Sequence, residues 1–364
     1  MIPWAKPEFF GNEINYVTDS LKSTWISDGA YLSKLEFYFK EKLIKKFVLP
    51  VSNGTTALHL AYLGLGLNPG DEIIIPGFGF LAAANIALHM NLKPIFAEVD
   101  PLTWCLSPEK ISHFFHPGKT KALVVIHTYG NVCNMKEIMR FADKNKIAVI
   151  EDCAESLFSK IDGRYCGTFG KINTFSFQAT KTITTGEGGL VVTDSKILND
   201  KMLLYRSHGM NRGKKYYWHE LPGHNFRLTN FQAALGVAQL ENIKKIISER
   251  KRVYELYVKN LSQKEGLSLQ KIDTGVDPVM WTLALKLNPK SFKQGRDKVI
   301  EQLKKKGIEC RPGFYASSLL KIYPKHSLPT CEEISKNVVC LPTFLSLKNE
   351  EIAFICKQLL KLRN

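Results

Sequence analysis

The chain has 364 residues, of which 45% are hydrophobic and 23% charged, a composition that excludes a disordered protein. Its 50 basic and 34 acidic residues give a formal net charge of +16, but the lysines are interleaved with glutamate, which indicates solvated helix faces rather than a nucleic-acid surface. The apolar runs are strand-sized, and no basic leader precedes one at the N-terminus. We therefore expect a cytoplasmic protein that is not inserted in a membrane.

Apolar strand-sized runs alternate with helical segments from about residue 47 to residue 194. In chain order they are FVLPVS, TALHLAYLGLGL, DEIIIP, LAAANIALHM, KALVVIH, NMKEIMRFADKNK and IAVIED. Continuous apolar runs indicate strands buried on both faces, as in a parallel α/β sheet. Asn134 with Glu137, and Thr229 with Gln232, have the spacing of capping boxes and mark the starts of two helices.

The character of the chain changes after about residue 245. A long charged helical segment, NIKKIISERKRVYELYVKNL, leads into shorter strands and helices. We predict a large domain over residues 1–245, with an N-terminal segment over residues 1–30, and a smaller C-terminal domain over residues 246–364.

Eight cysteines occur singly, without C-x-x-C spacing and without a histidine at the spacing of a zinc site. Isolated cysteines of this kind are common in protein cores. We expect buried thiols and no metal site at Cys105, Cys133, Cys153, Cys166, Cys310, Cys331, Cys340 and Cys356.

The first candidate binding element follows the first strand. In SNGTTALHL, Gly54 and Thr55 open a helix with Leu58, Ala61 and Leu65 on one stripe. The backbone N–H groups at a helix start suit a phosphate. Taken alone, the same motif also fits an ordinary strand-to-helix turn.

A carboxylate stands at the end of a later strand, where open α/β sheets bind ligands. The run IAVIE leads directly into Asp152, which could hold a positive charge such as a pyridinium nitrogen. A helix N-cap is the alternative for Asp152 on this fragment alone. Glu155 would lie on the same side if a helical turn follows.

The stretch FSFQATKTITTGEGG places one lysine between an apolar strand and a glycine-rich turn. Ser176 offers a hydroxyl to a phosphate, and Lys181 follows five residues later. A desolvated lysine has a lowered pKa and can attack a carbonyl to form a Schiff base. A cofactor with an aldehyde, a phosphate and a ring nitrogen would use each of these parts, and pyridoxal 5'-phosphate is such a cofactor.

Several motifs also resemble the DegT/StrS family of nucleotide-sugar aminotransferases, in order and spacing over nearly the whole chain. They are WISDGAYLSKLE, SNGTTALHLA, PGFGFLAAAN, EDCAES, FSFQATKTITTGEGG, GHNFRLTNFQAALGVAQLE, ECRPGFY and VVCLP. The segments KTITTGEGG and YWHE resemble most closely those of the perosamine synthases within that family. The resemblance implies the aspartate-aminotransferase-like fold (type I), with a mainly parallel seven-stranded sheet in the large domain and a smaller α/β domain.

The resemblance also implies roles at the cofactor. Lys181 matches the lysine that binds the cofactor covalently and then moves protons, and Asp152 matches the carboxylate on the pyridine nitrogen. Glu155 matches the group near the ring hydroxyl, and Phe80 matches the ring that stacks on the cofactor, which leaves Phe78 as a core residue. The matching phosphate cradle consists of Gly54, Thr55 and Ser176.

Other roles concern the substrate and a second subunit. Asn225 in GHNFR matches a residue that reaches the phosphate from the partner subunit, which implies a homodimer with shared active sites. Weaker matches near the substrate cleft are Trp25, Ser27, His127, Arg227 and Arg311.

The expected reaction is amino transfer from glutamate to a nucleotide-linked 4-keto-6-deoxy sugar, with GDP-4-keto-6-deoxymannose favoured, for O-antigen or other surface polysaccharide. Two departures from the family, Ala83 and the FQATK wording, lie near cofactor and sugar and leave UDP- and dTDP-linked sugars open. The related sugar dehydratases carry histidine at the position of Lys181, which argues against dehydration. A non-catalytic binding protein would leave Lys181, Asp152 and Ser176 unexplained.

Overall fold

The computed structural model describes residues 1–211 and 213–363. Its largest element is a seven-stranded sheet with the strand order β1-β9-β8-β5-β4-β2-β3. The strands are β1 (Phe47–Val51), β2 (Glu72–Pro76), β3 (Lys93–Ala97), β4 (Thr120–Ile126), β5 (Ala148–Asp152), β8 (Ile172–Ser176) and β9 (Gly189–Thr193). Of these, β9 runs antiparallel to both of its neighbours, and the others are parallel to one another. The carboxyl ends of β1, β5 and β8 therefore share one edge of the sheet.

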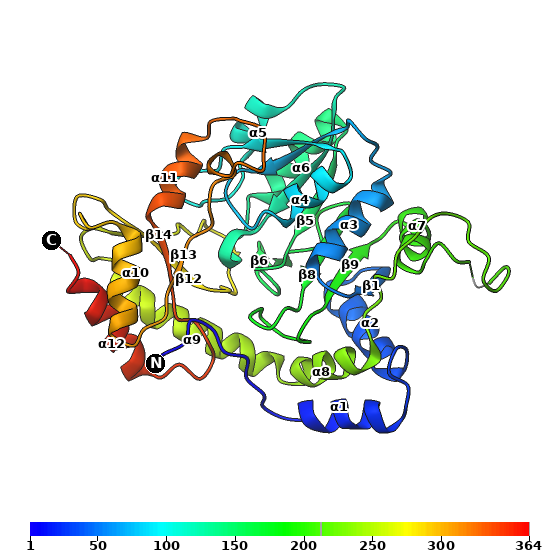
Figure 1. Cartoon of the computed structure of the whole chain (residues 1–364), viewed down its shortest axis with the longest axis horizontal. Coiled ribbons are helices and arrows are strands. Elements are labelled where there is room, and N and C mark those ends of the chain that lie inside the picture. Colours follow the sequence, from blue (N-terminus) through cyan, green and yellow to red (C-terminus); the bar gives the residue numbers. More distant parts are fainter. Residues whose placement is uncertain (212, 364) are drawn as a thin grey trace.

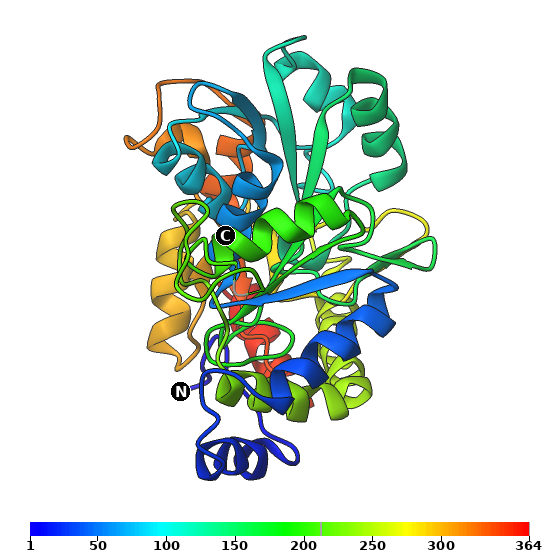
Figure 2. The ribbon, with the colours of Figure 1, turned by 90° about the vertical axis from the view of Figure 1, so that its right-hand side faces the viewer.

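The sheet is buried on both faces, as the continuous apolar runs predict. On β4, Ala122, Val124 and Ile126 join one hydrophobic core, whereas Leu123 and Val125 join another. Helices cover both faces, so each strand contributes alternate residues to two cores. In both views α1 lies at one end of the molecule and α5 and α6 lie at the opposite end, with the sheet between them (Figures 1 and 2).

The helices alternate with the strands in the first half of the chain and pack around both sheets. They are α1 (Glu13–Lys22), α2 (Ala30–Leu43), α3 (Gly54–Leu65), α4 (Ala82–His89), α5 (Pro108–Phe114), α6 (Met135–Asn145), α7 (Lys196–Arg206), α8 (Asn230–Glu241), α9 (Ile243–Leu261), α10 (Arg296–Lys305), α11 (Pro329–Asn337) and α12 (Asn349–Leu360), with short 3₁₀ turns at Thr128–Gly130 and Ser317–Leu319. None of the helices in the described ranges is long and apolar enough to cross a membrane.

Both predicted helix starts are confirmed. The Asn134 side chain accepts a hydrogen bond from the backbone N–H of Glu137 at the start of α6. At α8, the Gln232 side chain reaches back to the backbone N–H of Thr229 over 3.2 Å. These contacts satisfy N–H groups that a helix start leaves without an intrahelical partner.

A second sheet has four strands in the order β10-β12-β14-β13, all paired antiparallel. These strands are β10 (Leu267–Leu269), β12 (Leu283–Leu287), β13 (Arg311–Pro312) and β14 (Val338–Leu341). Figure 1 shows this sheet beside α10 and α12, with α9 running from the large sheet towards it. Helix α9 belongs to both parts, because Ile246 packs in the core near α2 and α8 whereas Val253 and Tyr257 pack in the core of the small sheet.

Two further contacts tie distant segments together. A three-stranded sheet pairs β11 (Val276–Asp277) with β6 (Lys160–Ile161) and β6 with β7 (Arg164–Tyr165). At the N-terminus, Ile2 forms a parallel bridge with Ile308, and the backbone N–H of Thr343 donates to the carbonyl of Trp4. The first residues of the chain are thereby held against the small sheet. The predicted boundary at residue 245 falls within α9 and stays a prediction.

Candidate active site

A cavity of about 790 Å³ opens at the carboxyl ends of β1, β5 and β8. It collects side chains from the N-terminal segment, the large sheet and the segment before β12. Its lining is Trp4, Asn53, Gly54, Thr55, Thr56, Leu58, Phe80, Ala82, Ile126, Asp152, Ala154, Glu155, Ser176, Gln178, Thr180, Lys181, Glu187 and Trp281. Seven residues that the sequence singled out for the cofactor thus lie together: Gly54, Thr55, Phe80, Asp152, Glu155, Ser176 and Lys181.

One wall of the cavity is a helix start with free N–H groups. The Asn53 side chain caps α3 by accepting a hydrogen bond from the Thr56 N–H over 2.8 Å, which leaves the N–H groups of Gly54 and Thr55 for an anion. A Cβ at Gly54 would stand 2.9 Å from the Cβ of Ser176 and 3.2 Å from its Oγ. Glycine is therefore required here because it lets the helix start approach the Ser176 hydroxyl. The arrangement is a cradle for a phosphate.

Asp152 ends β5 and is almost fully buried. Its Oδ1 accepts a hydrogen bond from the Ala154 N–H over 3.1 Å in a turn, and no helix begins there, so the N-cap alternative is not observed. Burial raises the pKa of Asp152, while the Ala154 N–H and the charge of Lys181 oppose this rise. A cationic ring nitrogen would supply the countercharge that burial otherwise denies this carboxylate.

Glu155 is a second buried carboxyl group in the cavity wall. Its Oε2 accepts a hydrogen bond from the Tyr129 N–H over 2.6 Å. Burial raises the pKa of Glu155 to about 7, even though Lys181 and the Tyr129 N–H act to lower it. Near neutral pH this group can therefore either donate or accept a hydrogen bond.

Lys181 lies opposite these two acids in the loop between β8 and β9. Its Nζ lies 3.9 Å from the centre of the Trp281 ring. Burial lowers the pKa of Lys181, Glu155 and Asp152 act to raise it, and Arg250 lowers it further. A lowered pKa increases the fraction of neutral amine, which is the nucleophilic form.

Phe78 and Phe80 lie in different environments. Phe80 is 59% exposed and lines the cavity, whereas Phe78 is fully buried in the core. An exposed ring at the cavity mouth is free to stack on a flat ligand.

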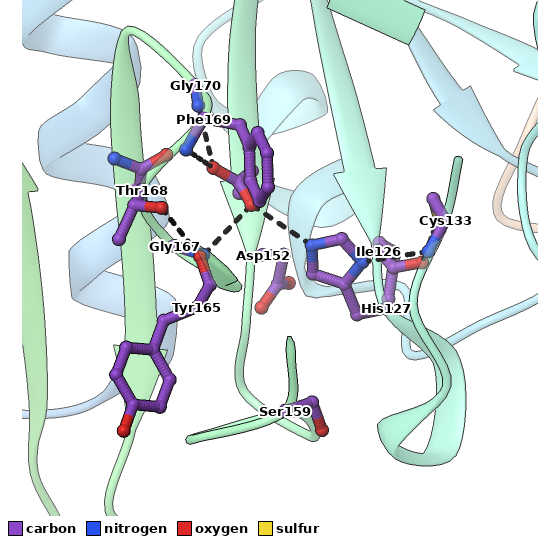
Figure 3. Close-up of polar contacts among 12 residues, drawn as sticks. Ile126, His127, Cys133, Asp152, Ser159, Tyr165, Gly167, Thr168, Phe169 and Gly170 are labelled. Carbon is purple, nitrogen blue, oxygen red and sulfur yellow. Dashed lines mark hydrogen bonds and ion pairs between the residues drawn. The ribbon is translucent and has the colours of Figure 1, made fainter. Parts of the chain in front are cut away.

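His127, which was expected near the substrate cleft, does not line the cavity, and its role there stays a prediction. His127 is fully buried and its Nε2 donates to Glu151 over 3.1 Å, while its Nδ1 accepts from the Cys133 N–H. Figure 3 shows the His127 ring between Cys133 and the loop of Gly167 to Gly170. Because hydrogen bonds hold both ring nitrogens, the His127 side chain stabilises the sheet next to Asp152 and is not free to bind a ligand.

Glu151 explains why the histidine is held there. Its carboxylate also accepts hydrogen bonds from the N–H groups of Gly167, Phe169 and Gly170. Burial opposes ionisation, but these bonds and that from His127 outweigh it and lower the pKa of Glu151. Glu151, His127 and Cys153 have ligand atoms close enough for a metal ion. The carboxylate and the ring are already engaged within the protein, which gives no reason to assign a metal there. All eight cysteines are buried and free, as expected.

The remaining predicted residues lie outside the cavity. Ser27 and Arg227 line a second cavity of about 650 Å³ beside α2 and α7. Trp25 is 66% exposed, and Asn225 is exposed in the segment between α7 and α8, where it pairs with Ser207. Arg311 is exposed on β13, bonded to Glu309 at 2.6 Å and with its guanidinium 5.9 Å from the Trp4 ring.

Among the lining side chains that the sequence did not single out are Trp4, Gln178 and Trp281. Gln178 lies in the segment FSFQATKTITTGEGG, and its position between Ser176 and Lys181 is the signal that could have found it. Trp4 and Trp281 come from the two distant segments held against the small sheet. No local pattern connects them with Lys181, so only the fold reveals them.

The residues present suit pyridoxal phosphate. A glycine-lined cradle can take the phosphate, Asp152 a ring nitrogen, Phe80 the ring face, and Lys181 the aldehyde. A sheet of this order with such a site defines the class of pyridoxal phosphate-dependent transferases.

Comparison with known proteins gives the family. Residues 8–360 match the DegT/DnrJ/EryC1/StrS aminotransferase family, and the chain belongs to it. The chain is 39% identical over 363 residues to GDP-perosamine synthase of Escherichia coli O157:H7, covering 98% of this chain and 97% of that protein. The chain is therefore a pyridoxal phosphate-dependent sugar aminotransferase.

Solved structures agree with this fold. The crystal structure of the aminotransferase TlmJ from Streptoalloteichus hindustanus superposes with a TM-score of 0.94 at 26% identity, covering 100% of this chain and 98% of that one. The E. coli GDP-4-keto-6-deoxy-D-mannose-3-dehydratase with bound hydrated PLP gives a TM-score of 0.92 at 25% identity, covering 99% of each chain. The predicted fold class is confirmed.

Proposed function

We propose that this enzyme transfers the amino group of glutamate to GDP-4-keto-6-deoxymannose, giving GDP-perosamine for surface polysaccharide such as O-antigen. The likeness over nearly the whole chain to a protein named GDP-perosamine synthase carries this proposal. The cavity with Lys181, Asp152 and the phosphate cradle supports it, since these are the groups that the chemistry needs.

When bound, pyridoxal phosphate serves as an electron sink for the charge that forms when a proton leaves carbon. Asp152 keeps the ring nitrogen protonated, and Gly54, Thr55 and Ser176 hold the phosphate. The neutral Nζ of Lys181 takes the proton from the α-carbon of glutamate and later delivers a proton to the sugar carbon that becomes the amine-bearing carbon. Proton transfer by a positioned base is commonly worth about 10²- to 10⁴-fold in rate.

Dehydration of the same sugar is the second candidate, because a protein of that activity shares the fold. The related sugar dehydratases carry histidine at the position of Lys181. Lys181 is present in this chain and lines the cavity, and its charge interacts with those of Glu155 and Asp152. These observations favour amino transfer.

We also propose a homodimer with shared active sites. Asn225 does not line the cavity of its own chain and is exposed in the segment between α7 and α8. Part of this segment extends from the body of the protein after α7 (Figure 1). Exposed rings concentrate in the same segment at Tyr216, Tyr217 and Trp218. An Asn225→Ala variant, mixed with a Lys181→Ala variant, tests this: activity recovered in the mixture supports shared sites, and none recovered contradicts them.

The substrate is tested with a panel of 4-keto-6-deoxy sugars linked to GDP, UDP and dTDP, each with glutamate, aspartate or alanine as donor. We expect kcat/KM with the GDP-linked sugar and glutamate to exceed every other pair by at least about tenfold. A product whose mass shows a lost hydroxyl instead of a gained amine would identify a dehydratase. A higher kcat/KM with a UDP- or dTDP-linked sugar would replace the proposed substrate and leave the aminotransferase class intact.

A further inference from the structure

Arg250 is a buried arginine that the reaction described above does not use. It lies in the middle of α9, with 6% of its surface exposed. No ion pair among residues 1–211 and 213–363 includes it, and its Nε is buried without a hydrogen-bond partner in that set. Burial of this uncompensated cation lowers the pKa of Arg250 to about 10. Keeping such a charge inside a protein is costly, which calls for a reason.

The guanidinium is bonded to backbone carbonyls from two separate segments. Its Nη2 donates to the carbonyl of Lys181 over 2.8 Å. Its Nη1 donates to the carbonyls of Trp281 over 3.2 Å and Met280 over 3.4 Å. One planar group thus joins the loop that carries Lys181 to the segment that enters β12.

Trp281 completes a closed arrangement with the same loop. Its Nε1 donates to the carbonyl of Thr180 over 2.9 Å, while its ring lies 3.9 Å from the Nζ of Lys181. The backbone N–H of Trp281 donates to the carbonyl of Tyr129, which fixes the segment from the other side. The consecutive carbonyls of Thr180 and Lys181 are therefore both held by donors from outside the loop.

We propose that Arg250 is a positioning residue for Lys181, which ties the lysine loop to Trp281 and so sets the place of the amine over the indole ring. This inference rests on the proposed role of Lys181 as the proton-transferring amine. Helix α9, which reaches from the large sheet to the small one, would thus hold the loop that carries Lys181 in place.

The charge of Arg250 acts together with its hydrogen bonds. The charged groups that face Lys181 are Asp152 at the end of β5, Glu155 in the following turn and Arg250 on α9. Both acids favour the protonated amine, and Arg250 favours the neutral one. Losing the guanidinium removes a contribution that lowers the pKa of Lys181, so that pKa should rise.

The test compares two variants. Arg250→Gln removes both the charge and the planar guanidinium that bonds to two segments, whereas Arg250→Lys keeps only the charge. Arg252→Gln is the matched control, because Arg252 lies on the same helix and bonds to the carbonyls of Leu345 and Leu347, away from the cavity. For each full-length protein, acetylation of Lys181 by acetic anhydride is followed against pH in the cofactor-free form by peptide mass spectrometry. Steady-state kcat with cofactor and the Tm are measured in parallel.

We expect the midpoint of Lys181 acetylation in Arg250→Gln to move to higher pH, with kcat lowered by about tenfold or more because a small displacement of a reacting group is costly. Arg250→Lys should keep the midpoint of the native protein but lose kcat. Arg252→Gln should change Tm without changing either. Midpoints and kcat in both Arg250 variants equal to those of Arg252→Gln would overturn the proposal.

If Arg250→Gln does not fold, Arg250→Lys and Trp281→Phe decide the matter, since the second removes only the indole donor to Thr180 and keeps a ring. Reduced kcat in both supports the arrangement, and kcat equal to that of Arg252→Gln in both overturns it. Failure of the proposed function is read separately, from a native enzyme that transfers no amino group.

Discussion

The carboxyl group of Glu155 accepts a hydrogen bond from the Tyr129 N–H over 2.6 Å inside a fully buried site. Burial raises the pKa of Glu155 from 4.5 to about 7. Between these values the folded protein holds a proton that the unfolded chain has released. The contribution of Glu155 to stability is therefore full below pH 4.5, falls as the pH rises from 4.5 to 7, and is lost above pH 7.

Glu155→Gln should remove this dependence. We expect the free energy of unfolding of the native protein to fall, relative to the variant, by up to about 3 kcal/mol between acid and neutral pH. Urea unfolding of the cofactor-free chain over that range measures the difference. Glu109→Gln, an exposed change on α5, is the control and should run parallel to the native protein. Parallel curves for Glu155→Gln as well would contradict a raised pKa at this position.

Asp152→Asn should separate chemistry from binding. The amide keeps the shape and the bond from Ala154 but cannot hold a proton on a ring nitrogen. We expect kcat to fall by about 10²- to 10³-fold, the scale of losing one preorganised electrostatic contact, while pyridoxal phosphate still binds. Asp200→Asn, which alters contacts with Lys196 and Asn199 outside the active-site cavity, should retain full kcat. A kcat within about threefold of the native value would show that Asp152 does not act on the ring.

Gly54→Ala should damage the phosphate cradle. Its Cβ would come within 2.9 Å of the Cβ of Ser176, so α3 or β8 must shift. Lost hydrogen bonds to a charged group cost about 1.5–3 kcal/mol, so the Kd for pyridoxal phosphate should rise about tenfold or more. Ser176→Ala removes one hydroxyl without moving the helix and should cost less. Equal Kd values for the native protein and Gly54→Ala would exclude this wall as the phosphate site.

His127→Ala should weaken the fold rather than the recognition of substrate. It leaves the buried Glu151 carboxylate without one of its donors, which should lower the free energy of unfolding by about 3 kcal/mol. The KM for the sugar should stay within about twofold at a temperature where the variant is folded, because a structural change does not alter binding contacts. His113→Ala, at an exposed position on α5, should change neither quantity. A large rise in KM without loss of stability would return His127 to the cleft.

The strands and the sites at their ends could be predicted from sequence because their signals are local. The apolar runs from 47 to 152 become β1, β2, β4 and β5 and their covering helices, whereas β3 is not among the predicted strands. Asp152 and Ser176 follow from strand ends. The lysine loop is likewise local, since a strand and a glycine-rich turn bracket Lys181.

Other features depend on contacts between distant parts of the chain. His127 stands at a strand end like Asp152, yet the ring turns into the core because Glu151 and the Cys133 N–H satisfy both of its nitrogens. Trp281 and Arg250 reach Lys181 only because α9 and the segment before β12 pack against the lysine loop. No periodicity in the sequence marks such contacts.

The central claim is that Lys181 binds and operates pyridoxal phosphate, and a visible absorbance spectrum tests it most directly. The native protein and Lys181→Ala are each supplied with pyridoxal phosphate and then with glutamate. We predict a yellow band in the native protein that bleaches with glutamate, and a variant that lacks the band or does not respond to glutamate. A native protein that stays colourless after pyridoxal phosphate is added, or a variant that bleaches as the native protein does, would contradict the account.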